Sequence, residues 1–156
     1  PQNEILSVST IFVRRFDVRP LQTLVARLAF TRGWNLDRDV QFAADGETGL
    51  RGYRLHAFEG DRTVVVNVEQ RIFSMREILQ LVAPGAAVFF DAGTAAPPGA
   101  PLTFRDVKKD AGAGLRLGIP RAATNSVIRI DLAYAFDRDA LGRKGFLLSF
   151  SSSQAF

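Results

Sequence analysis

The sequence contains no cysteine among its 156 residues and only one histidine, His56. The absence of cysteine excludes a disulfide framework, zinc-thiolate chemistry and a cysteine nucleophile. A single histidine excludes a histidine-rich metal site, and a catalytic triad would need this one residue. No G-x-S-x-G sequence is present either. The sequence therefore predicts no enzyme activity, no metal site and no cofactor.

Long apolar runs and long basic runs are also missing. No stretch approaches the ~20 uncharged apolar residues that a membrane-spanning helix needs, and no basic-then-apolar leader is present. The Lys and Arg residues outnumber the Asp and Glu residues by 20 to 16, but they are scattered and never form a run of five. This pattern predicts no nucleic-acid partner. Because the chain starts at Pro1 without a methionine, the missing leader says nothing about export.

What the sequence does contain is period-two alternation, in about seven segments of ten or so residues bounded by Gly, Pro, Asp or Asn. The clearest segment spans residues 126–136, where apolar residues alternate with charged or small ones, as in Ile128, Arg129, Ile130, Asp131 and Leu132. Residues 21–34, 62–73 and 111–119 alternate in the same way. Each predicted strand therefore has one apolar face and one face that holds charge or glycine.

The connections between the predicted strands differ in length at the two ends of the sheet. Those at one end are mostly long, above all the stretch from Asn35 to Asp61, and those at the other end are mostly short, such as "VRP". Alternation alone fits both a soluble sandwich with an apolar core and a barrel whose apolar face meets lipid. Long loops at one end and short turns at the other are typical of outer-membrane barrels. The sequence therefore predicts an all-β fold, an antiparallel transmembrane β-barrel surrounded by outer-membrane lipid.

Seven strands do not complete such a barrel. Single-chain bacterial barrels have even strand numbers and keep both ends in the periplasm. Unpaired strand edges are not tolerated in hydrocarbon. We therefore expect residues 1–156 to be the C-terminal portion of a larger barrel, which upstream strands or a second chain would close.

Three short motifs follow one another in the middle part of the chain: "GLRGYRLHAFEGDR", "VVVNVEQR" and "AAVFFDAG". Together with the aromatic C-terminus, they resemble the BamA/TamA/FhaC superfamily of outer-membrane assembly and translocation barrels, also called bacterial surface antigens. The resemblance extends from about Thr48 to Phe156. It implies a protein of the bacterial outer membrane that inserts barrel proteins or translocates polypeptide, with the barrel assembly machinery and a client polypeptide as partners and no cofactor.

The resemblance also implies a loop tip that folds into the barrel lumen and locks there. Its arginine would be Arg51, within the motif formed by Gly49, Leu50, Arg51, Gly52 and Tyr53. Its acidic partners would be Glu69 and Asp91, on two following strands. A guanidinium that bridges two carboxylates makes charge-assisted bonds of specific geometry. The alternative is that Arg51 is a solvated loop residue and that the two acidic residues are ordinary luminal charges.

Alternation in the sequence agrees with this assignment. It places Glu69 on the polar face. Asp91 directly follows Phe90, which is on the apolar face, so Asp91 is on the polar face as well. Glycine lacks a side chain and permits close approach of another segment. We therefore expect the glycines of the facing strand to leave room for the loop tip, and these are Gly112, Gly114 and Gly118.

The C-terminal strand resembles the signal by which such barrels are recognised for membrane insertion. This signal has an aromatic last residue preceded by alternating apolar residues, which here are Phe146, Leu148, Phe150 and Phe156. The alternative is an edge strand of a soluble sheet that ends on phenylalanine.

Members of the superfamily usually carry periplasmic POTRA domains, which receive the client, and none is visible in these residues. A second hypothesis is therefore a passive membrane anchor, in a reduced or lipase-fused family member. A third hypothesis, from a different class, is a soluble β-sheet domain that binds an apolar ligand.

Overall fold

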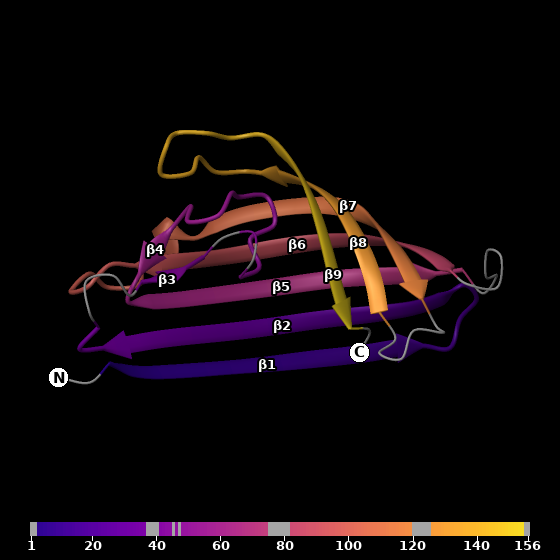
Figure 1. The fold of residues 1–156 in the computed structure, drawn as a ribbon, viewed down its shortest axis with the longest axis horizontal. Coiled ribbons are helices and arrows are strands. Elements are labelled where there is room, and N and C mark those ends of the chain that lie inside the picture. Colours follow the sequence, from indigo (N-terminus) through magenta and orange to yellow (C-terminus); the bar gives the residue numbers. More distant parts are fainter. Residues whose placement is uncertain are drawn as a thin grey trace.

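The computed structural model describes residues 3–36, 41–44, 46, 48–74, 82–119 and 126–154. Seven long strands form one antiparallel sheet in the order β1-β2-β5-β6-β7-β8-β9, so each strand pairs with the next long strand of the chain (Figure 1). The prediction of an all-β antiparallel fold is confirmed. The strands are β1 (Glu4–Phe16), β2 (Leu21–Trp34), β5 (Arg62–Phe73), β6 (Ala83–Ala96), β7 (Lys108–Ile119), β8 (Ser126–Ala135) and β9 (Phe146–Gln154).

The sheet is strongly curved but is not closed into a barrel within the described residues. Strands β1 and β9 occupy its two edges. Strands β8 and β9 turn steeply over the side of the sheet on which the long loop lies (Figure 1). The curvature gives the sheet a concave face and a convex face.

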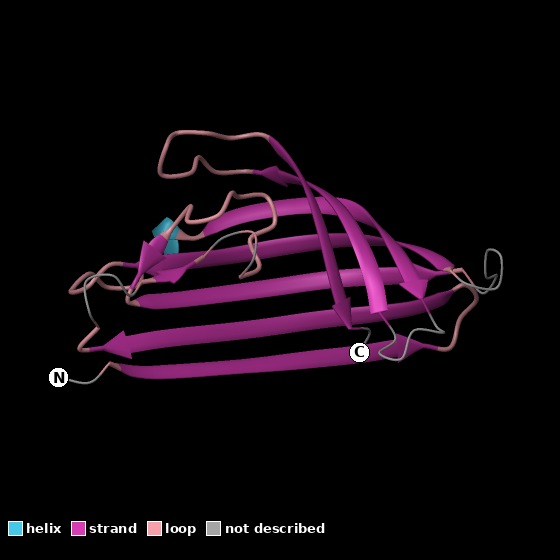
Figure 2. Ribbon diagram, in the orientation of Figure 1, coloured by secondary structure: helices cyan, strands magenta, loops and turns pink. Residues whose placement is uncertain are grey.

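The long connections lie at the end of the sheet where β1 begins (Figure 2). The connection between β2 and β5 carries two short strands that pair with each other, β3 (Phe42–Ala43) and β4 (Glu59–Gly60). The connection between β6 and β7 holds one turn of 3-10 helix, η1 (Phe104–Asp106). Among the described residues there is no helix long and apolar enough to cross a membrane.

The register of the strands decides which side chains share a face, because residues directly opposite each other point to the same side. Glu69 of β5 lies opposite Val25 of β2 and Phe89 of β6. Asp91 lies opposite Asn67 of β5 and Asp110 of β7. The polar sides of these strands therefore form one continuous concave face.

The convex face is apolar and exposed across the whole sheet. Val88 and Phe90 of β6 are 58% and 42% exposed. The other exposed apolar residues of this face include Leu6, Val8, Phe12, Leu28, Val66, Val68, Ile72, Leu115, Ile128, Leu132, Phe146, Leu148 and Phe150. The side chains that a soluble domain of this kind would bury are thus on the outside of the curve.

Candidate functional site: a loop tip bound to the concave face

The tip of the long loop, residues 49–53, lies against the concave face of the sheet. Gly49 has φ +132°, a conformation that favours glycine. Asn67 of β5 donates a hydrogen bond from Nδ2 to the Gly49 carbonyl at 2.5 Å. Leu50 and Tyr53 are buried in a cluster with Val65 of β5 and Ala135 of β8. Apolar burial and a backbone contact therefore fix the tip on both sides of Arg51.

Tyr53 connects the tip to β7 and to the residues that follow β8. Its hydroxyl donates to the carbonyl of Lys109 at 2.9 Å and accepts from the amide of Asp137 at 3.3 Å. Its ring meets the ring of Phe58 edge-on, with centroids 5.1 Å apart. Burial of the hydroxyl raises the pKa of Tyr53 to about 12, so this side chain remains neutral at physiological pH.

The structure brings Arg51 together with both of the acidic residues that the sequence assigned to it. Nε donates to Asp91 Oδ2 at 2.8 Å, and Nη2 donates to Asp91 Oδ1 at 2.9 Å. Nη1 donates to Glu69 Oε2. The guanidinium also lies over the ring of Phe89, with Cζ 3.5 Å from the ring centroid.

Burial alone would lower the pKa of Arg51, but the hydrogen bond and charge of Asp91, together with those of Glu69, raise it above the ordinary value. Arg51 is therefore a permanent cation in contact with the carboxylates of Asp91 and Glu69, and its Nη1 also lies 3.7 Å from Oδ2 of Asp131.

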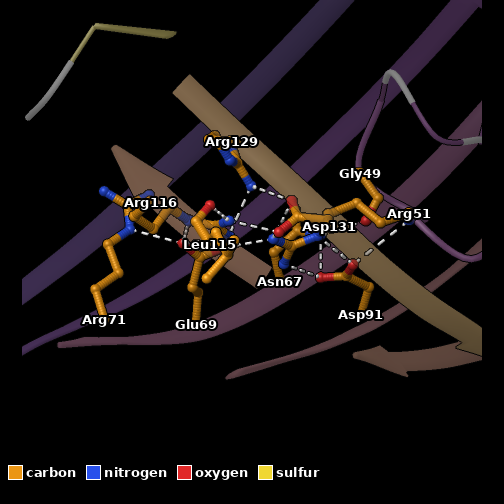
Figure 3. A network of polar contacts seen from close by, with 10 residues as sticks. All are labelled: Gly49, Arg51, Asn67, Glu69, Arg71, Asp91, Leu115, Arg116, Arg129 and Asp131. Atoms are coloured by element: carbon orange, nitrogen blue, oxygen red, sulfur yellow. Dashed lines mark hydrogen bonds and ion pairs between the residues drawn. The ribbon is translucent and has the colours of Figure 1, made fainter. Parts of the chain in front are cut away.

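Glu69 is the centre of a larger network that the sequence did not predict (Figure 3). Its Oε1 accepts from Arg71 Nε at 2.7 Å and from Arg116 Nε at 3.2 Å. Its Oε2 accepts from Arg129 Nη2 at 3.3 Å as well as from Arg51. One carboxylate thus links the loop tip to β5, β7 and β8.

Asp131 of β8 is the second carboxylate of this network. It pairs with Arg116, and its Oδ2 accepts from Arg129 Nη2 at 3.4 Å. Alternation had placed Arg71, Arg129 and Asp131 on the polar face, but nothing in the pattern showed that they meet Glu69. The arrangement can hold the loop tip against four neighbouring strands.

The expectation that the glycines of β7 leave room for the loop tip is wrong in its detail, because the atoms nearest to Gly112 and Gly114 belong to other side chains and to the backbone of β8. A Cβ at Gly112 would lie 2.5 Å from Cζ of Phe89, and one at Gly114 would lie 1.9 Å from Oδ1 of Asp131. A Cβ at Gly118 would meet only ordinary contacts at 3.5 Å or more. Gly112 supports the tip only indirectly, since it accommodates the ring on which Arg51 lies.

The predicted C-terminal signal lies apart from the tip. Phe146, Leu148 and Phe150 of β9 are exposed on the convex face, opposite Tyr134, Leu132 and Ile130 of β8. Phe156 lies outside the described residues. His56 is an exposed loop residue whose Nδ1 is 2.6 Å from Oε1 of Glu59.

A cavity of about 770 Å³, open to solvent on one side, lies on the concave face beside the tip and is lined by residues of the network and by β9. In comparisons with known proteins, no family model and no curated protein matches the chain.

Proposed function

We propose that the chain is part of an outer-membrane β-barrel of the BamA/TamA/FhaC superfamily, which inserts barrel proteins into the outer membrane or translocates polypeptide across it. The observation that carries this proposal is the contact of Arg51 with Glu69 and Asp91. These are the acidic residues that the resemblance assigns to the loop arginine. A solvated loop arginine would have no reason to occupy this buried position.

The convex face supports the membrane part of the proposal. Its apolar residues continue across all seven long strands, so the band is far larger than the patches that isolated surface residues form. The strands contain 9 to 14 residues, whereas a strand that crosses the bilayer needs ~9–11 residues. Lipid is the partner that an apolar outer face and a charged inner face would require.

In this proposal, the tip acts as a lock on the luminal side of the barrel wall. Its single guanidinium contacts carboxylates of β5, β6 and β8 directly and reaches β7 through the shared carboxylate of Glu69. The edges of β1 and β9 would pair with upstream strands or with a second chain, and the seam between the first and last strands would open for the client.

Membrane fractionation tests the proposed location. The chain should sediment with outer membranes, require detergent for extraction and migrate faster in gel electrophoresis before boiling than after it. Recovery in the aqueous phase without detergent would favour the soluble ligand-binding alternative. The intact mass of the protein extracted from the membranes would then show whether upstream strands and periplasmic domains accompany these residues.

Substitution Arg51→Ala tests the proposed lock. We expect it to leave membrane insertion intact while lowering the stability of the barrel or the rate of client handling. Unchanged heat-modifiability and unchanged activity in this variant would contradict the lock and favour the passive anchor.

A further inference from the structure

A second pair of acidic residues lies directly beneath the loop tip. Asp91 of β6 and Asp110 of β7 are opposite each other in the register of the sheet, and both side chains are 0% exposed. Asp91 is satisfied by Arg51 and by Asn67, whose Nδ2 donates to Oδ1 at 2.8 Å. Neither carboxyl oxygen of Asp110 makes a hydrogen bond of normal geometry among the described residues, and the nearby backbone amide of Gly52 compensates its burial only in part. We call these two residues the carboxyl pair.

The groups around Asp110 do not supply the missing counter-charge. From β6 it faces Asp91, and from the loop it faces Arg51 and Tyr53, with Asp137 next to Tyr53. In the part of the chain that the structure describes, Arg51 is the one cation of another element that faces Asp110, and its donors are already directed to Asp91 and Glu69.

The two lysines that precede Asp110 on its own strand are directed elsewhere. The ammonium of Lys108 lies over the ring of Phe58, 5.6 Å from its centroid, and the side chain of Lys109 alternates to the opposite face. An ionised Asp110 would therefore be a buried, unpaired charge beside a like charge, an arrangement that costs far more than protonation does.

We infer that Asp110 carries a proton at neutral pH, that the carboxyl pair shares this proton, and that its loss to solvent releases the loop tip. The proton lets Asp110 act as a donor to Asp91, so the pair holds one negative charge in place of two. This single negative charge balances the positive charge of Arg51, which binds Asp91 through two hydrogen bonds.

Release of the tip follows from the lack of space above Asp110. A Cβ built on Gly52 would lie 2.6 Å from Cβ of Asp110 and 3.0 Å from its Cγ. The backbone of the tip thus covers the carboxyl group closely, and an ionised Asp110 could gain water only if the tip moved away. As the pH rises, the undocked form gains stability relative to the docked form. The inference rests on the proposed role of the tip as a lock, and it adds the proton as the signal that controls this lock.

The chain has no cysteine, so a single introduced thiol can report on the tip. Val65 is 3% exposed and lies beneath the tip in one cluster with Leu50 and Tyr53. We would measure the alkylation rate of Val65→Cys by N-ethylmaleimide in the full chain between pH 5.5 and 8.5, divided by the rate of the exposed variant Leu55→Cys. The ratio should rise about tenfold across this range. This is the change in the docking equilibrium that the loss of one proton produces over one pH unit. In Asp110→Asn, which donates to Asp91 at every pH, the ratio should stay low and constant.

Three controls make the outcome decisive. Arg51→Ala should give a high ratio at all pH values, which shows that the reagent reaches Val65→Cys when the tip is released. His56→Gln removes the one histidine and should leave the profile unchanged. Circular dichroism should show that Asp110→Asn keeps its strand content.

If the alkylation ratio does not change with pH while Asp110 is unchanged, the inference is overturned, and no substitution of Asp110 is needed for this result. The same rise in Asp110→Asn as in the parent would overturn it too. The alkylation experiment does not measure transport, so its failure is distinct from failure of the proposed function. Failure of the proposed function would be seen in membrane fractionation, as a chain that does not associate with membranes.

Discussion

Arg51 binds Asp91 through two parallel hydrogen bonds, from Nε at 2.8 Å and from Nη2 at 2.9 Å. This fork geometry is available to arginine and not to lysine, whose ammonium is a point charge. The third nitrogen, Nη1, is left to contact Glu69. The orientation of the whole loop tip therefore depends on the planar shape of one guanidinium.

Substitution of Arg51 should consequently affect stability in a graded way. Arg51→Ala leaves buried carboxylates without their counter-charge, which should lower the free energy of unfolding by ~3–5 kcal/mol. Arg51→Lys keeps the charge but loses the fork, which should cost roughly 1.5–3 kcal/mol. Urea titrations in detergent, followed by circular dichroism, would measure both values. Arg54→Ala changes an exposed arginine three residues away and should have little effect; equal losses at positions 51 and 54 would contradict the assignment.

Phe89 should contribute to the position of Arg51 because its ring lies 3.5 Å from the guanidinium carbon. Phe89→Leu removes the ring face and should weaken docking of the tip by ~0.5–2 kcal/mol. The result would be faster alkylation of a thiol at Val65→Cys. The matched control is Phe90→Leu, which changes the next residue of β6 on the convex face and should leave that rate unchanged. A faster rate in both variants would show a general loss of stability.

The all-β antiparallel fold was predictable from the sequence because the two faces of the sheet differ in composition. Ile128 and Ile130 alternate with Arg129 and Asp131, and this pattern records which side of the strand is apolar. Alternation leaves no such record of curvature, so the degree to which the sheet bends could not be predicted from it. The pairing of β3 with β4 was missed because each has two residues, too few to show any period.

The site was predictable only for the residues that share a motif. Arg51, Glu69 and Asp91 were assigned to one another by the family resemblance that three short motifs carry. Arg116 and Arg129 were not connected with Glu69, because alternation tells which face a side chain is on and not which residue of another strand reaches it. The opposition of Asp91 and Asp110 depends in the same way on the register of β6 and β7, which periodicity does not specify.

Close approach of the tip to the sheet predicts that Gly52 tolerates no side chain. A Cβ at this position would lie 2.6 Å from Cβ of Asp110 and 3.2 Å from the amide nitrogen of Ala135. Gly52→Ala should therefore cost ~1–3 kcal/mol through overpacking, measured by urea titration. Gly118→Ala is the control, because Gly118 is on the same face of β7 as Asp110. A Cβ at this position would meet nothing closer than 3.5 Å, so this substitution should be neutral. Wild-type stability in Gly52→Ala would mean that the tip does not rest on Asp110.

The apolar convex face allows the membrane proposal to be tested at one residue. Val88 lies in the middle part of β6 and is 58% exposed. In a bilayer, Val88→Lys should cost ~2–4 kcal/mol because an ammonium would replace an apolar group that faces lipid. Folding into lipid vesicles, followed by urea titration, would measure this cost. Leu55→Lys, at a loop position of 55% exposure, should change little. If Val88→Lys were equally neutral, the convex face would be a surface that meets water, and the barrel proposal would fail.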